Sequence, residues 1–143
     1  MKTLQEALFS RKNINKSYEE DTFKISHSRF NIQETLEVFF DNEKNAFTFS
    51  IITSKGSISD NTSATLKLYD IQKFIKALSS TQKGDVYFDG LDSTKITLVS
   101  ALTSFKSLTV YERNRDFDTF DFINKDEEKS LIEFLKRMIR IYL

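Results

Sequence analysis

The chain has 143 residues, 39% of them hydrophobic and 29% charged, which is the composition of an ordinary folded domain. Its 14 Phe and 5 Tyr favour β-sheet, and a sequence without Cys excludes disulfides and thiolate metal sites. Lys plus Arg and Asp plus Glu balance at 21 each, so there is no overall basic excess of the kind that favours nucleic-acid binding. No apolar run reaches the length of a membrane span and no signal peptide is evident, so we expect a cytoplasmic protein without membrane segments.

The first half of the chain predicts a helix, four strands and a second helix. Apolar residues at helical spacing predict a short helix over Thr3–Lys12, followed by a polar loop. Alternation with a period of two then predicts four strands, at Phe23–Phe30, Leu36–Phe40, Phe47–Ile52 and Thr65–Tyr69. We expect a hairpin turn at Asp41–Asn45, and a loop at Ser54–Ser63 because that segment is rich in Ser, Asp, Asn and Gly. Asp70 is expected to cap a helix whose core stripe is Ile71, Phe74, Ile75 and Leu78.

The second half repeats this order of elements. Strands are predicted at Val86–Phe88, Lys95–Ala101, Ser107–Glu112 and Phe117–Phe122. Asp89 and Gly90 form a turn dipeptide between the first two of these strands. Asn124 and Glu127 have the spacing of a capping box, which predicts the start of a long C-terminal helix. The apolar stripe of this helix is Leu131, Leu135, Met138, Ile139 and Tyr142.

The repeated order predicts an α+β protein built from two tandem β-β-β-β-α units. The units span residues 23–84 and 85–143 and follow an N-terminal helix and loop in residues 1–22. We expect the two antiparallel sheets to pack together in one compact domain, with the helices bracing them. The C-terminal helix carries additional apolar residues at Ile132, Phe134 and Ile141. It therefore either fills the core or docks a partner, and we expect a homo-oligomer through it.

Two tandem units of four strands and one helix resemble the Whirly family of single-stranded nucleic-acid-binding proteins. They are also similar to the mitochondrial guide-RNA-binding proteins and to coactivators of the positive-cofactor-four type. The resemblance covers residues 23–143 and implies sheets whose strands radiate like blades, helices that help to form an oligomer, and single strands bound across the sheets. The lysine-glycine-lysine strand motif of the plant members has no counterpart here, and its nearest match is Phe23-Lys24-Ile25. The resemblance therefore transfers no site residue.

Candidate binding residues follow instead from alternation along the strands. Proteins that bind single strands stack bases on aromatic rings and contact phosphates with Lys and Arg. The strand residues that oppose the apolar faces are Lys24, Phe39, Lys67, Tyr69, Tyr87, Lys95, Tyr111 and Arg113. Lys67–Tyr69 and Tyr111–Arg113 each place a ring two residues from a cation on the same side of a strand. The same pattern is typical of any half-exposed antiparallel strand, which is the simpler interpretation for each single residue.

Other possible sites have less support in the sequence. Asp116 and Asp118 form an Asp-x-Asp pair that could hold Mg²⁺ in a nuclease, although solvent-facing carboxylates opposite a buried set of rings are the simpler interpretation. The buried rings are expected to be Phe117, Phe120 and Phe122. His27 is the single His, and it is expected to be a packing or surface residue. The three Gly are too scattered for a phosphate-binding loop.

We therefore predict a protein without enzymatic activity, catalytic residues, metal site or cofactor that binds single-stranded DNA or RNA. The alternative is a protein-protein interaction module, such as a phage-type inhibitor or an assembly subunit. The neutral charge and the apolar C-terminal helix favour this alternative.

Overall fold

Four consecutive strands form the first sheet in the computed structural model, which describes residues 21–100, 105–113 and 116–142. The strands are antiparallel and lie in chain order: β2 (Thr22–Arg29), β3 (Ile32–Asp41), β4 (Ala46–Lys55) and β5 (Ile58–Lys67). A two-residue turn joins β2 to β3, with Phe30 and Asn31 at φ 53° and 64°, the left-handed conformation that tight hairpins require. The predicted turn at Asp41–Asn45 is confirmed, and Asp41 Oδ1 accepts hydrogen bonds from the backbone amides of Glu43 and Lys44.

The loop predicted at Ser54–Ser63 is wrong, because this segment continues β4 and forms most of β5. Its small polar residues alternate along two paired strands, and their hydroxyls interact across the pair instead of marking a loop. Ser50 Oγ lies 2.7 Å from Ser63 Oγ, and Ser54 Oγ lies 3.3 Å from Ser59 Oγ. The hairpin turns at Gly56, whose φ of 60° suits glycine.

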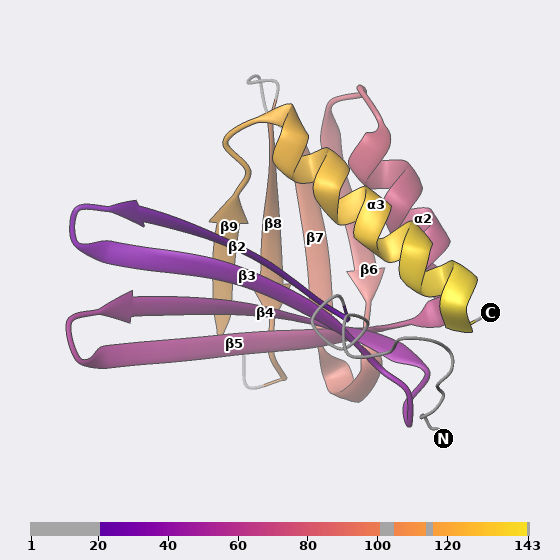
Figure 1. The fold of residues 1–143 in the computed structure, drawn as a ribbon, viewed down its shortest axis with the longest axis horizontal. Coiled ribbons are helices and arrows are strands. Elements are labelled where there is room, and N and C mark those ends of the chain that lie inside the picture. Colours follow the sequence, from indigo (N-terminus) through magenta and orange to yellow (C-terminus); the bar gives the residue numbers. More distant parts are fainter. Residues whose placement is uncertain (1–20, 101–104, 114–115, 143) are drawn as a thin grey trace, which may run out of the picture.

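The second sheet has the same topology with shorter strands. Its order is β6 (Gly84–Asp89), β7 (Lys95–Ser100), β8 (Lys106–Tyr111) and β9 (Phe117–Asp121). A short 3₁₀ helix, η1 (Leu91–Ser93), follows Gly90 between β6 and β7. The strands of the second sheet run behind those of the first and cross them (Figure 1).

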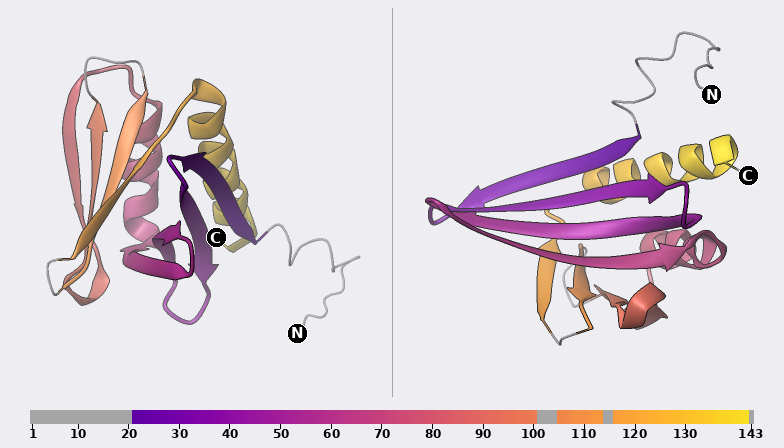
Figure 2. Two further views of the ribbon diagram at one scale, coloured as in Figure 1. Left: turned by 90° about the vertical axis from the view of Figure 1, so that its left-hand side faces the viewer. Right: turned by 90° about the horizontal axis from the view of Figure 1, so that it is seen from below.

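Two helices follow the sheets and lie side by side. They are α2 (Leu68–Ser79) after β5 and α3 (Lys125–Tyr142) after β9. In both side views α2 lies between the second sheet and α3 (Figure 2). Asn124 Oδ1 accepts a hydrogen bond of 2.9 Å from Glu127 N, and Glu127 Oε1 accepts one of 3.0 Å from Ile123 N. The predicted reciprocal cap of α3 is therefore confirmed, although Glu127 reaches one residue beyond the cap.

Helix α2 begins at Leu68, earlier than predicted, so Tyr69 belongs to a helix and not to a strand. Leu68 is buried and precedes Ile71, Ile75 and Leu78 at helical spacing, so the apolar stripe extends one turn before Asp70. Asp70 therefore lies inside the first helical turn, where its charge suits the helix dipole, and it is not the cap.

One hydrophobic core joins both sheets and both helices. Phe74 of α2 lies at its centre, with its ring centroid 5.0 Å from that of Phe49 in the first sheet and 5.5 Å from that of Phe88 in the second. The stripe of α3 is buried in the same core through Leu131, Phe134, Leu135 and Met138. The α+β class with two antiparallel four-stranded sheets is thus confirmed.

The free edge of β5 is closed by the second half of the chain. Ser63 N donates a hydrogen bond of 2.9 Å to Glu112 Oε2, and Thr65 N donates one of 3.2 Å to Thr94 Oγ1. Because an uncovered strand edge can pair with other chains, these contacts protect the first sheet and fix where the second one meets it.

The helix predicted at Thr3–Lys12 lies outside the described residues. None of the helices in the described part of the chain is both long and apolar enough to span a membrane.

Candidate nucleic-acid interface

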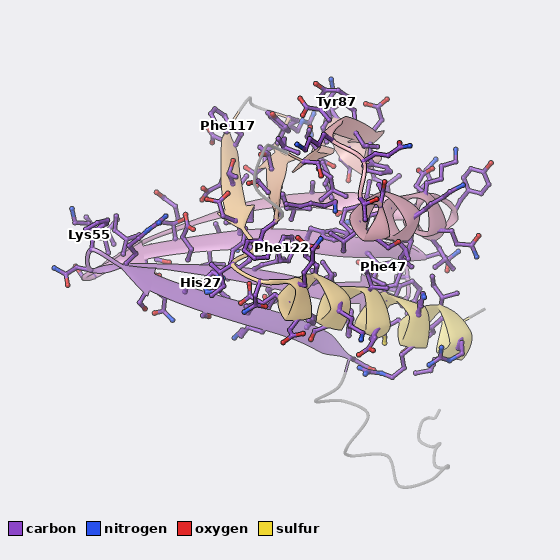
Figure 3. All side chains as sticks on the ribbon, turned by 90° about the horizontal axis from the view of Figure 1, so that it is seen from above. His27, Phe47, Lys55, Tyr87, Phe117 and Phe122 are labelled. Atoms are coloured by element: carbon purple, nitrogen blue, oxygen red, sulfur yellow. The ribbon has the colours of Figure 1, made fainter. Side chains whose placement is uncertain are left out.

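Three aromatic rings and a lysine lie on the outer face of the second sheet, and we call Tyr87, Lys95, Tyr111 and Phe117 the aromatic face. The register pairs Lys95 with Tyr111 and Tyr111 with Phe117, in one row across β7, β8 and β9. Tyr87 of β6 is opposite Thr97, two residues along β7 from Lys95. Tyr87 is 71% exposed and Phe117 is 65% exposed, and both point away from the first sheet (Figure 3).

Threonines form the floor between these rings. Thr97 and Thr109 lie on the outer side of the sheet but are only 4% and 7% exposed. Thr109 Oγ1 lies 2.9 Å from Thr119 Oγ1 on the neighbouring strand, so the hydroxyls interact across strands. The ring centroids of Tyr111 and Phe117 are 5.8 Å apart. The aromatic face therefore consists of exposed rings above closely packed threonines, and flat groups can stack on these rings.

Carboxylates surround the aromatic face. Tyr87 Oη donates to Asp85 Oδ2 over 3.3 Å, and the charge and hydrogen bond of Asp85 raise the pKa of the Tyr87 phenol. Asp89 is opposite Lys95 in the register, and Asp121 Oδ1 accepts a hydrogen bond of 2.6 Å from Ser107 Oγ. This face therefore carries more negative than positive charge, which weakens its attraction for phosphates.

Three other predicted residues lie together on the outer face of the first sheet. Lys24, Phe39 and Lys67 share this face with a series of Ser and Thr residues. Lys24 Nζ lies 3.7 Å from Glu37 Oε2, and Phe39 is half-buried. These three residues were predicted to lie on the side of the strands opposite to the apolar side, and the register confirms this. The strands of this sheet carry no exposed aromatic ring on this face, however, on which a base could stack.

The two predicted ring-and-cation pairs do not form as expected. Tyr69 is 79% exposed on α2, with Lys73 Nζ 5.4 Å from its ring centroid, so it does not share a strand with Lys67. Arg113 is exposed but lies beyond the end of β8, and the ring nearest Tyr111 is Phe117. The second sheet thus gathers Tyr87, Lys95 and Tyr111, whereas Tyr69 is excluded from both sheets.

Sequence reasoning missed Phe117, which it placed among buried rings. The register shows that Phe117 and Asp121 share the outer face, while Phe120 and Asp118 point inward. The breaking of the apolar pattern between Phe117 and Phe120 was the available signal, since residues three apart on a regular strand face opposite sides.

The second carboxylate of the Asp-x-Asp pair is held by hydrogen bonds within the protein. Asp118 Oδ2 accepts a hydrogen bond of 2.7 Å from Thr53 Oγ1, and its Oδ1 accepts one of 2.8 Å from Thr119 N. Asp118 therefore points towards the first sheet and is half-buried there. Within residues 21–100, 105–113 and 116–142, no group of three or more His, Asp or Glu is placed to hold a metal ion.

His27 is half-buried and makes packing contacts, which agrees with the expected packing or surface role. Its ring stacks on Phe120 with centroids 5.0 Å apart, and its Nε2 lies 3.2 Å from Glu127 Oε1. These contacts join β2, β9 and the start of α3, and they account for the residue without a catalytic role.

No protein-family model matches the chain, and no curated protein matches it significantly. The functional assignment therefore depends on the geometry of the surfaces described above.

Proposed function

We propose that the protein binds single-stranded nucleic acid on the aromatic face and has no enzymatic activity. The observation that carries this proposal is the set of exposed rings on adjacent strands, Tyr87, Tyr111 and Phe117, with Lys95 among them. Base stacking on such rings contributes roughly 1–3 kcal/mol per base and tolerates any sequence.

The shape of this surface favours single strands over duplexes. Unpaired bases can turn towards a sheet and stack on its rings, whereas paired bases are already stacked and expose only their edges. Lys95, which is exposed among the rings, would contact the phosphates between stacked bases, and Arg113, exposed just beyond the end of β8, would add a second cation. The order of elements adds support, because two tandem four-stranded units with one helix each resemble the Whirly family, in which single strands lie across the sheets.

Fluorescence anisotropy of a labelled oligo-dT and of its duplex, at low and moderate salt, tests the proposal. We expect tighter binding of the single strand, weakened by salt through counterion release. The Tyr87→Ala, Phe117→Ala double variant should bind about tenfold more weakly or worse, since two stacking rings are removed. Tyr69→Ala is the matched control, because Tyr69 is equally exposed but lies on α2. Equal binding by the double variant would contradict the proposed surface.

A protein partner is the second candidate, and the carboxylates around the rings favour it. Asp85, Asp89 and Asp121 on this face would attract a basic protein surface and repel phosphates. Under this alternative the oligonucleotide does not bind even at low salt, while a specific host protein binds the wild type and not the double variant. Association of copies through α3 stays a prediction, because its apolar stripe is buried in the chain's own core.

A further inference from the structure

A cavity of about 420 Å³ lies at the C-terminal end of α2, where the helix meets the start of β6. Its charged lining consists of four lysines and one aspartate: Lys73, Lys76, Lys83, Lys106 and Asp85. We call this site the lysine pocket. The lysines come from α2, from the connection that follows it and from β8, so the fold brings together residues from three segments.

Lys106 is the buried member of the pocket. It is 4% exposed, and its Nζ donates a hydrogen bond of 2.7 Å to the carbonyl oxygen of Ser80. An ammonium group has three donors, and no carboxylate of the described residues lies within 4.0 Å of this one. Glu128 is nearby, but its Oε2 accepts from the backbone amide of Lys106, and its Oε1 lies 3.7 Å from Lys125 Nζ.

Burial lowers the pKa of Lys106, and the charge of Glu128 opposes this only in part. A buried charge without an ion pair is costly, and a negative ligand in the pocket would remove that cost. Capping of the last carbonyls of α2 is another role for a lysine here, and it accounts for the bond to Ser80.

Capping does not account for the other three lysines. Lys73, Lys76 and Lys83 are exposed around the same cavity, and none forms an ion pair with a described carboxylate. The ammonium group of Lys73 lies 5.4 Å from the ring centroid of Tyr69. Like charges around one cavity repel each other, and an anion bound between them would relieve this repulsion. Asp85, the one acid of the lining, already accepts the Tyr87 hydroxyl.

We propose that the lysine pocket binds a phosphate group. Four lysines and one aspartate leave a net charge of +3, which suits a group that carries roughly −1.5 to −2 charge and three acceptor oxygens. The cavity volume falls within the range of sites for small ligands, roughly 300–1,000 Å³. Free phosphate compounds and the terminal phosphate of a nucleic acid share this chemistry.

The terminal phosphate of a nucleic acid bound on the aromatic face would lie near the pocket, because only the edge strand β6 separates the two sites. Val86 of β6 lines the pocket, and the next residue, Tyr87, points to the opposite side of the sheet, which it shares with Asp85. A strand whose base stacks on Tyr87 would bring its phosphate around the edge of β6. Binding of a free phosphate compound, by contrast, does not depend on the function proposed above.

Calorimetric titration of the full chain with inorganic pyrophosphate tests the pocket. We expect binding that sodium chloride of equal ionic strength does not reproduce. The Lys76→Gln, Lys83→Gln variant should bind about tenfold more weakly, because two charged donors are lost. Lys44→Gln, Lys55→Gln is the matched control and should keep wild-type affinity, since Lys44 is exposed in a turn of the first sheet and Lys55 is exposed at the end of β4. Equal affinity in the pocket and control variants, or absence of pyrophosphate binding, would overturn the proposal.

A comparison of 5′-phosphorylated and unphosphorylated oligo-dT identifies the source of the phosphate. Tighter binding of the phosphorylated strand by the wild type, lost in the pocket variant, would assign the pocket to a nucleic-acid end. Equal binding of the two strands, with pyrophosphate still bound, would assign it to a free phosphate compound. Pyrophosphate binding by the Tyr87→Ala, Phe117→Ala variant shows that the pocket works even where the aromatic face fails.

Discussion

Gly90, which follows β6, lies against the backbone of β5, and its lack of a side chain is required there. A Cβ on Gly90 would lie 2.4 Å from the carbonyl oxygen of Thr65 in β5 and 2.6 Å from Thr94 Oγ1. Since a backbone oxygen cannot move aside easily, we expect Gly90→Ala to lower the free energy of unfolding by about 1–3 kcal/mol, as overpacking does in cores. Urea denaturation measures this change.

Gly56 provides the comparison for Gly90. A Cβ there would meet nothing within 4 Å, and its φ of 60° is one that Asn tolerates. Gly56→Asn should therefore change the free energy of unfolding by only a few tenths of a kcal/mol. A loss at Gly90 no larger than this would show that β5 and the turn after β6 can separate without cost.

Glu34 gives the stability a pH dependence. Burial on β3 raises the pKa of Glu34, Asp118 and Asp121 raise it further, and Arg29 and His27 oppose them. Glu34 therefore stays protonated to higher pH in the folded protein than in the unfolded chain. The stability that this bound proton contributes is lost as the pH rises from the pKa of the unfolded chain through the raised pKa of the folded protein. Glu34→Gln removes this loss.

We expect Glu34→Gln to be more stable than the wild type at pH 7 by a few tenths of a kcal/mol, because solvent screens this half-exposed group. At pH 4 and below the advantage should disappear. Urea midpoints at the two pH values measure the difference, and Glu43→Gln in the exposed turn after β3 is the control. A variant less stable than the wild type at pH 7 would show that Glu34 makes favourable contacts as an anion.

At the scale of elements, apolar periodicity predicted both described helices and the positions of seven of the eight described strands, β5 being the exception. Periodicity did not identify the start of β5, because a strand that begins with Ile58-Ser59-Asp60-Asn61 shows no alternation of apolar and polar residues and has the composition of a loop. Such a strand forms because its partner β4 supplies the hydrogen bonds and the matching hydroxyls. Likewise, the start of α2 at Leu68 depends on a core that only the folded chain provides.

The cap of α3 links this helix to the first sheet. Asn124 accepts from Glu127 N, and the carboxylate of Glu127 also lies 3.2 Å from His27 Nε2 on β2. Asn124→Ala leaves a helix amide without its partner, so we expect a loss of about 0.5–2 kcal/mol in unfolding free energy. Thermal and urea denaturation measure it, with Asn42→Ala in an exposed turn as the control. If both variants lose the same amount, the cap does not stabilise α3.

At the scale of the whole molecule, the alternation of side chains along the strands predicted much of the aromatic face but nothing of the lysine pocket. Tyr87, Lys95 and Tyr111 lie on strands that are neighbours in the chain, so alternation alone placed them on one surface. The pocket joins the end of α2 to the start of β8, a contact that depends on how the second sheet packs against the helix. Periodicity within one element carries no information about such packing.

The shared core predicts that the two sheets unfold together. Phe74 touches rings from both sheets and is fully buried, so Phe74→Ala should lower the unfolding free energy by about 3–5 kcal/mol. Hydrogen exchange of the slowest amides in β4 and β8 should show equal losses, because one opening event exposes both. Phe30→Ala is the control, since Phe30 is 86% exposed in a turn and contributes little to the core. A loss confined to one sheet would instead show that each four-stranded unit, with its helix, opens on its own.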